Sequence, residues 1–144
     1  MSKGSKGLFN LSKDIKGLVA SYLVQEDASV AKNEIMHEYT DYFVRNGYLD
    51  VLKYFQICEN NPERNRYLCR LAASNGHLNV LKHLYDIDPV NKMDLSVGMH
   101  AARGGHLDVL KYLHENECPR DQNAYIEAAF KGNLDVLKYL HQNK

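Results

Sequence analysis

The chain of 144 residues lacks net charge, because its 18 lysines and arginines balance 18 aspartates and glutamates. A neutral chain has no overall attraction to nucleic acid or to an anionic membrane. No apolar run approaches the roughly 20 residues of a membrane-spanning helix, and the basic N-terminal residues lack the apolar core of a secretory signal. These absences predict a cytoplasmic or nuclear protein that is not secreted, with no membrane partner and no nucleic-acid partner.

Cysteines and catalytic motifs are also scarce. Cys58, Cys69 and Cys118 are odd in number and scattered, which argues against a disulfide framework and favours a reducing compartment. The sequence has no Cys-x-x-Cys, no His-Glu-x-x-His and no glycine-rich phosphate loop, so the usual spacings of a zinc or phosphate site are missing. We therefore expect no metal, no cofactor and no catalytic residues, and a protein that is not an enzyme.

What the sequence does contain is one ten-residue block in four near-copies. The copies read GYLDVLKYFQ, GHLNVLKHLY, GHLDVLKYLH and GNLDVLKYLH, and they begin 29, 29 and 27 residues apart at Gly47, Gly76, Gly105 and Gly132. A constant period of this length is typical of stacked repeat architectures. In the third copy Leu107, Leu110 and Leu113 recur at i, i+3 and i+6, which predicts a helix with one apolar stripe after each glycine.

A second helix is predicted before each block. Alanine pairs, which favour helix and let a neighbouring helix approach closely, stand at residues 72–73, 101–102 and 128–129. A glycine just past a helix end accepts the left-handed backbone conformation. Each unit is therefore predicted to be a helix, a glycine turn, a second helix and a connector, with connectors at residues 57–62, 87–92 and 115–121. Such small units bury their apolar stripes by stacking on one another.

The histidines do not form a catalytic pattern. His77 and His106 directly follow two of the repeated glycines, where histidine can hydrogen-bond the backbone of the turn. Nothing in the sequence selects a nucleophile for any of the seven histidines, and a repeat stack lacks the deep pocket that catalysis prefers. We interpret His77 and His106 as scaffold.

The alanine and glycine stretches resemble ankyrin repeats, whose first helix ends in an alanine pair followed two residues later by Gly-His. The pattern reads Ala-Ala-Ser-Asn-Gly-His at residues 72–77 and recurs at residues 101–106. The resemblance implies an all-α ankyrin-type solenoid over residues 34–144, with units at 34–62, 63–91, 92–120 and 121–144. The family's Thr-Pro-Leu-His opening and Gly-Ala-Asp-x-Asn finger are missing, so we expect no well-formed β-hairpin fingers.

The sequence GHLDVLKYLHEN followed by Cys-Pro resembles repeats of the ankyrin proteins of giant viruses of amoebae and of some protists. For a viral protein, that likeness implies a host cell as the place of action.

Residues 1–33 precede the repeats and have two interpretations. Ser12 could cap a helix whose apolar face contains Ile15, Leu18, Tyr22 and Leu23, and this helix would cover the first repeat as an N-terminal cap. Residues 8–24 also resemble the opening helix of an F-box, although the tryptophan of that motif's tail is absent from the chain. An F-box would make the protein a substrate-recruiting adaptor of a cullin–RING ubiquitin ligase.

The repeat architecture predicts a module for protein–protein interaction. Stacked first helices and connectors create an extended concave surface, on which recognition varies where the units differ in sequence. The candidate partner-binding residues precede the glycines or lie in the connectors: Arg45, Asn46, Arg64, Ser74, Asn75, Asn91, Arg103, Gly104, Arg120, Gln122, Phe130 and Lys131. Five of them are basic, so we expect a protein partner with an acidic surface.

A nucleic-acid binder is the competing class. It would need aromatic stacking platforms in a basic groove. Tyr54, Tyr112 and Tyr139 repeat at one position of the second helix, so we interpret them as scaffold.

The last copy raises a separate question, because no unit follows it in this sequence. We expect Leu134, Leu137 and Leu140 to be shielded in some other way, or to be left for a partner or a further repeat.

Overall fold

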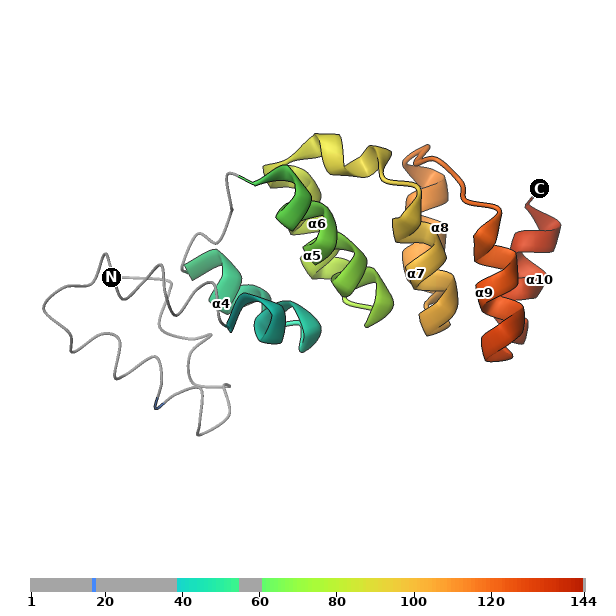
Figure 1. Cartoon of the computed structure of the whole chain (residues 1–144), viewed down its shortest axis with the longest axis horizontal. Coiled ribbons are helices and arrows are strands. Elements are labelled where there is room, and N and C mark those ends of the chain that lie inside the picture. The colour runs from blue at the N-terminus through green and yellow to red at the C-terminus, as the bar shows by residue number, and fades with distance from the viewer. Residues whose placement is uncertain (1–16, 18–38, 55–60, 144) are drawn as a thin grey trace, which may run out of the picture.

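The computed structural model describes residue 17, residues 39–54 and residues 61–143, and the last two ranges form a stack of helix pairs (Figure 1). Residues 39–45 are helical. The following helices are α4 (Leu49–Tyr54), α5 (Pro62–Ser74), α6 (Leu78–Ile87), the 3₁₀ helix η1 (Pro89–Met93), α7 (Ser96–Gly104), α8 (Leu107–Glu115), α9 (Asn123–Lys131) and α10 (Leu134–Gln142).

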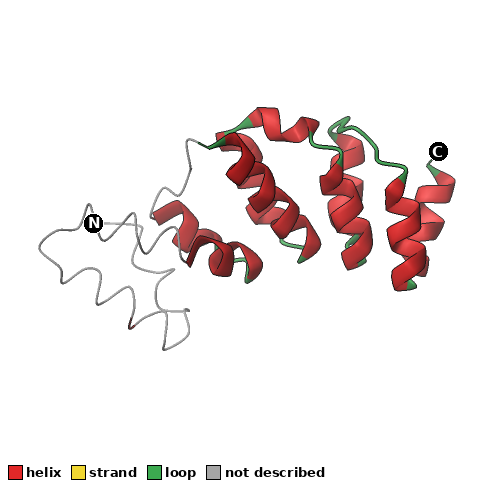
Figure 2. Ribbon diagram, in the orientation of Figure 1, coloured by secondary structure: helices red, strands yellow, loops and turns green. Residues whose placement is uncertain are grey.

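Helices and loops make up these described residues, and none of them lies in a strand (Figure 2). The predicted all-α repeat solenoid is confirmed. The predicted N-terminal cap and the F-box-like segment lie outside the described residues.

A glycine turn ends each first helix, as the sequence predicts. The φ angles of Gly47, Gly76, Gly105 and Gly132 are +71°, +74°, +78° and +73°. This left-handed region is open to glycine at little steric cost. At the end of α7 the amide of Gly105 donates to the carbonyl of Ala102, and the amide of His106 donates to that of Ala101. These two bonds satisfy carbonyls that the helix end would otherwise leave unpaired.

The core runs through all the described units. The alanine pairs of α5 and α7 are fully buried, and α7 packs against both α5 and α9. The valine of the repeated block is at most 1% exposed in every copy, at Val51, Val80, Val109 and Val136. Small residues on the first helices and branched residues on the second helices thus fill one continuous interior.

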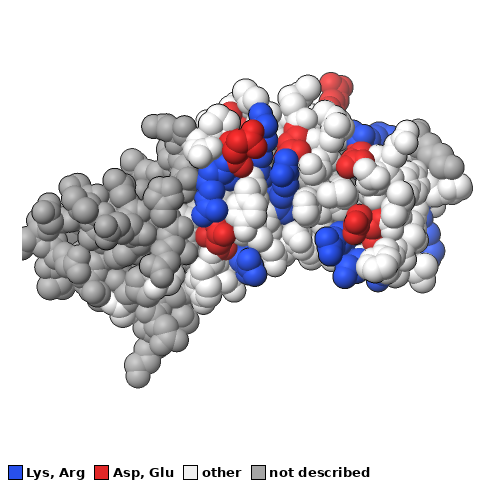
Figure 3. All heavy atoms as spheres, viewed as in Figure 1, with Lys and Arg blue, Asp and Glu red and all other residues white. Residues whose placement is uncertain are grey.

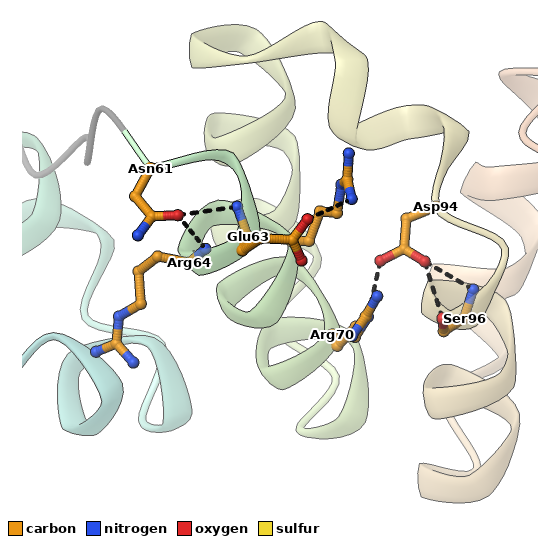
Figure 4. A network of polar contacts seen from close by, with 7 residues as sticks. Asn61, Glu63, Arg64, Arg70, Asp94 and Ser96 are labelled. Carbon is orange, nitrogen blue, oxygen red and sulfur yellow. Dashed lines mark hydrogen bonds and ion pairs between the residues drawn. The ribbon is translucent and has the colours of Figure 1, made fainter.

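The starts of α5 and η1 correct two predicted connectors. Asn61 Oδ1 accepts hydrogen bonds from the amides of Glu63 and Arg64 at 3.1 and 3.2 Å, so Asn61 caps α5 and Pro62 is its first residue (Figure 4). The predicted connector 87–92 also contains the end of α6 and most of η1. Pro89 has a fixed backbone angle that suits a helix start, and so this turn-forming sequence folds as a 3₁₀ helix.

An ion pair joins α5 to the start of α7. Arg70 Nε donates to Asp94 Oδ2 at 2.7 Å, while Asp94 Oδ1 accepts from the amide and the hydroxyl of Ser96 at 3.1 and 2.8 Å (Figure 4). Burial raises the pKa of Asp94, but the hydrogen bonds from Arg70 and Ser96 outweigh it and hold the pKa below its ordinary value. The carboxylate is therefore ionised at neutral pH and contributes to the stacking of two units.

Candidate interaction surface

A side chain from each following unit lies against the glycine turn before it. His77 Nε2 lies 2.8 Å from the carbonyl oxygen of Arg45, and His106 Nε2 lies 3.0 Å from that of Ser74. Because a carbonyl only accepts, each of these ring nitrogens donates. Asn133 replaces histidine in the last unit, and its Nδ2 donates to the carbonyls of Ala102 and Arg103 at 2.8 and 3.1 Å. These residues are scaffold, as predicted for the two histidines.

The close fit of these side chains also explains the glycines. A Cβ at Gly76 would lie 2.4 Å from Nδ1 of His106, and one at Gly47 would lie 2.5 Å from Nδ1 of His77. A Cβ at Gly104 would lie 2.5 Å from the carbonyl oxygen of Ser74. Gly104, a predicted partner-binding residue, is therefore required for the stacking of α5 on α7.

Two of the predicted polar residues are engaged with their own helices. Asn46 Nδ2 donates to the carbonyl of Tyr42 at 2.7 Å, and Asn75 Nδ2 donates to that of Leu71 at 2.8 Å. Both therefore cap carbonyls at a helix end. Ser74 and Asn75 are half-buried and Asn46 is exposed, so all three keep part of their surface for a partner.

Two of the five basic residues predicted to bind a partner form ion pairs. Arg64 Nη2 lies 2.6 Å from Asp41 Oδ1, and Arg103 Nε lies 3.6 Å from Glu127 Oε2. Arg120 Nη1 donates to the carbonyl of Asn143. Figure 3 shows the face of the molecule seen in Figure 1, on which acidic side chains lie among the basic ones over α5, α7 and α9.

Arg45 and Lys131 differ from these three. Both are exposed, and neither has an acidic partner within residues 39–54 and 61–143. They lie next to the first and the last glycine turns, so their charge is available at both ends of the described stack.

The connector residues are placed differently from one another. Asn91 is 1% exposed within η1, so its side chain is not available to a partner, which contradicts its selection from the sequence. Gln122 is exposed and precedes α9 without capping it through its side chain.

The stacked helix pairs agree with comparison to known families. A family model for ankyrin repeats matches three copies over residues 68–144, which is more than half of the chain. The protein belongs to the ankyrin repeat family. Neither a curated protein nor a solved structure matches the chain at a significant level. Ankyrin repeats generally mediate protein–protein interaction, and proteins built from them are typically scaffolds without catalytic activity.

The last ankyrin repeat exposes a cluster of apolar side chains, of which only Phe130 was predicted as a partner-binding residue. Ile126, Phe130 and Leu134 are 65%, 79% and 66% exposed, whereas Leu140 is buried. Ala129 is exposed too, although its equivalents Ala73 and Ala102 are fully buried under the next unit. The exposure of these side chains could have been predicted from the order of the repeats, because no further copy of the block packs on the fourth copy within the described residues.

Chemically reactive groups are not gathered in the ankyrin stack. No group of three or more His, Cys, Asp or Glu residues that could hold a metal occurs in the described ranges. Burial raises the pKa of the Cys69 thiol to about 12, so this thiol is protonated and a poor nucleophile. Tyr112 and Tyr139 pack against the core and so form no exposed platform for bases. Of the helices that the structure describes, none is long and apolar enough to cross a membrane.

Proposed function

We propose that this ankyrin repeat protein binds an acidic protein partner on the face formed by its first helices and the adjoining glycine turns. The second helices carry the repeated block and bury its valine in every copy, so they build the scaffold. The first helices carry residues that differ between units, such as Tyr67, Arg103 and Phe130, and the side chains of these three are exposed.

The free charges at the two ends of the described stack carry this proposal. Arg45 and Lys131 are exposed and have no acidic partner within the described ranges. Phe130 lies beside Lys131, whose ammonium nitrogen is 5.7 Å from the centre of the ring. Arginine and aromatic side chains are the residues that contribute most at protein interfaces. The proposed contact set therefore keeps Arg45, Phe130 and Lys131 and leaves out Gly104 and Asn91.

The test begins with the intact protein, which is used to capture and identify a partner by mass spectrometry. The double variant Arg45→Glu/Lys131→Glu should then bind that partner about tenfold more weakly, which corresponds to about 1.4 kcal/mol. Its affinity should also depend less on salt, because paired surface charges are screened. Lys138→Glu is the matched control, since Lys138 is exposed on α10, a second helix. An affinity that the double variant leaves unchanged would contradict the proposal.

The resemblance of residues 8–24 to an F-box supports a second candidate function, that of an adaptor which delivers ankyrin-bound proteins to a cullin–RING ubiquitin ligase. The expected partner is then the adaptor subunit of the ligase, bound through residues 1–33. If this subunit fails to bind the intact protein, the candidate is excluded.

The proposed binding of a protein partner also includes where in the cell that partner is found. The likeness of GHLDVLKYLH to the repeats of giant viruses supports a host protein of the cytoplasm or nucleus as the partner.

A further inference from the structure

A cavity of about 530 Å³ lies at the junction of the last two ankyrin repeats. Its apolar lining includes Leu110 and Leu113 of α8, Tyr125 of α9 and Leu140 of α10, with Gly98 of α7 among them. The volume and the lining are typical of a small-molecule site, which is mostly apolar with a few placed polar groups.

Two side chains that fill the preceding junction are replaced by smaller ones here. At the position nine residues after the turn glycine, the second unit has Tyr85 and the third unit has His114. At the position seven residues before that glycine, the second unit has Cys69 and the third unit has Gly98. Tyr85 is 1% exposed and Cys69 is fully buried, so both occupy the interior. Their replacement by imidazole and by hydrogen leaves space where close packing is the rule.

Gly98 has no structural need to be glycine. Its φ is not in the left-handed region, and the nearest atom to an added Cβ would be Cδ1 of Leu113 at 3.9 Å, an ordinary contact. A glycine inside a helix is destabilising relative to alanine. The residue thus weakens α7 without allowing any closer approach of the chain, and what it provides is room in the cavity.

The polar groups around the cavity indicate what would fill it. His114 Nδ1 lies 2.9 Å from the hydroxyl of Tyr139, so this pair is already engaged. Asp121 Oδ1 accepts from the amide of Asn123 at the start of α9, where the helix dipole favours a negative charge. Arg120 is exposed and binds only a neutral carbonyl among the described residues, so its charge is free to pair with an anion.

We propose that this cavity binds a small carboxylic acid with an aromatic or branched aliphatic body. The body lies between Leu110, Leu113, Tyr125 and Leu140, and the carboxylate pairs with Arg120. The proposal concerns the junction of α7 to α10 and is independent of the protein partner proposed above, because it involves neither Arg45 nor Lys131.

The probe for the test is 1-naphthylacetate, titrated into the intact protein and followed by ligand-observed NMR. A dissociation constant of about 1 mM or lower is expected for an acid of this size. Gly98→Leu and His114→Tyr, which refill the cavity, should each weaken binding at least tenfold, while circular dichroism checks that both variants are folded. Val90→Ser is the control, because Val90 is an exposed apolar side chain that does not line the cavity.

The role of the charge is tested with Arg120→Gln and with the uncharged analogue 1-naphthaleneethanol. Arg120→Gln should weaken the acid about fivefold or more and leave the alcohol unchanged. Equal affinities for the acid and the alcohol would overturn the proposed pairing of the carboxylate with Arg120 and would indicate a site for an apolar side chain instead. The proposal is also overturned if the acid does not bind, if both refilling variants bind it like the natural protein, or if Val90→Ser abolishes its binding.

Discussion

The four glycine turns share one backbone conformation but differ in what lies against them, and alanine substitution separates these two effects. All four φ angles lie between +71° and +78°. An alanine in this left-handed region costs about 1–2 kcal/mol. Backbone strain alone would therefore lower the free energy of unfolding by the same amount at every turn.

Gly76→Ala carries a second cost. The new Cβ would lie 2.4 Å from Nδ1 of His106, so the imidazole must move and lose its hydrogen bond to Ser74, which contributes about 0.5–1.5 kcal/mol. We expect Gly76→Ala to lower the free energy of unfolding by about 2–3 kcal/mol in total. Gly132→Ala, with nothing within 4 Å, should lower it by about 1–2 kcal/mol. Gly105→Ala should fall between them, because its Cβ would lie 3.0 Å from Asn133.

Urea unfolding followed by circular dichroism measures these differences. Repeating the Gly76→Ala substitution in a His106→Ala background provides the decisive comparison. Without the imidazole only the backbone strain remains, so the two substitutions should be non-additive, with a coupling of about 1 kcal/mol. Equal losses for Gly76→Ala and Gly132→Ala, or additive losses in the double variant, would refute the reasoning.

Three further predictions concern stability. Asn61→Ala should lower the free energy of unfolding by about 1 kcal/mol, because α5 loses the side-chain oxygen that caps it; thermal melting checks this. Asp94→Asn should lower the melting temperature at pH 7. Burial raises the pKa of Asp94, but hydrogen bonds from Arg70 and Ser96 outweigh this effect and hold the pKa below its ordinary value. The contribution of the carboxylate to stability is therefore present above the unfolded-state pKa and is lost as the pH falls through the folded-state pKa. The difference in melting temperature between Asp94→Asn and the natural protein should therefore shrink below about pH 4, and a constant difference would contradict this. Phe130→Ser should change the free energy of unfolding by less than about 0.5 kcal/mol, since the ring is 79% exposed; a larger loss in urea unfolding would show that Phe130 is part of the core.

The elements that one unit encodes by itself were predictable from the sequence. The glycines at the ends of the first helices, the alanine pairs and the apolar stripes of the second helices all recur in register, and each has a local physical cause. The histidine contacts were anticipated in kind, since His77 and His106 bind backbone carbonyls. That these carbonyls belong to the preceding unit follows from the packing and not from the sequence pattern.

Contacts between units were harder to predict. Arg64 reaches Asp41 and Arg70 reaches Asp94 across 23 and 24 residues of sequence, and such pairs depend on how neighbouring helices pack. The sequence therefore overstated the free positive charge of the first-helix face. Asn91 was misplaced for a related reason. Asparagine favours turns, but this connector folds into η1 and its Asn91 side chain is buried.

The single 3₁₀ helix among the described connectors has a consequence for how a partner is positioned along the stack. Packed helices lie about 8–10 Å apart, and successive units present nearly the same repeated block. A partner that read only the shared features could slide along the array by one unit and bind almost equally well in each position. The connector between α6 and α7 forms η1, whereas residues 116–122 between α8 and α9 contain no helix. A partner that touches η1 therefore has one alignment with the array, which the repeated block by itself does not specify.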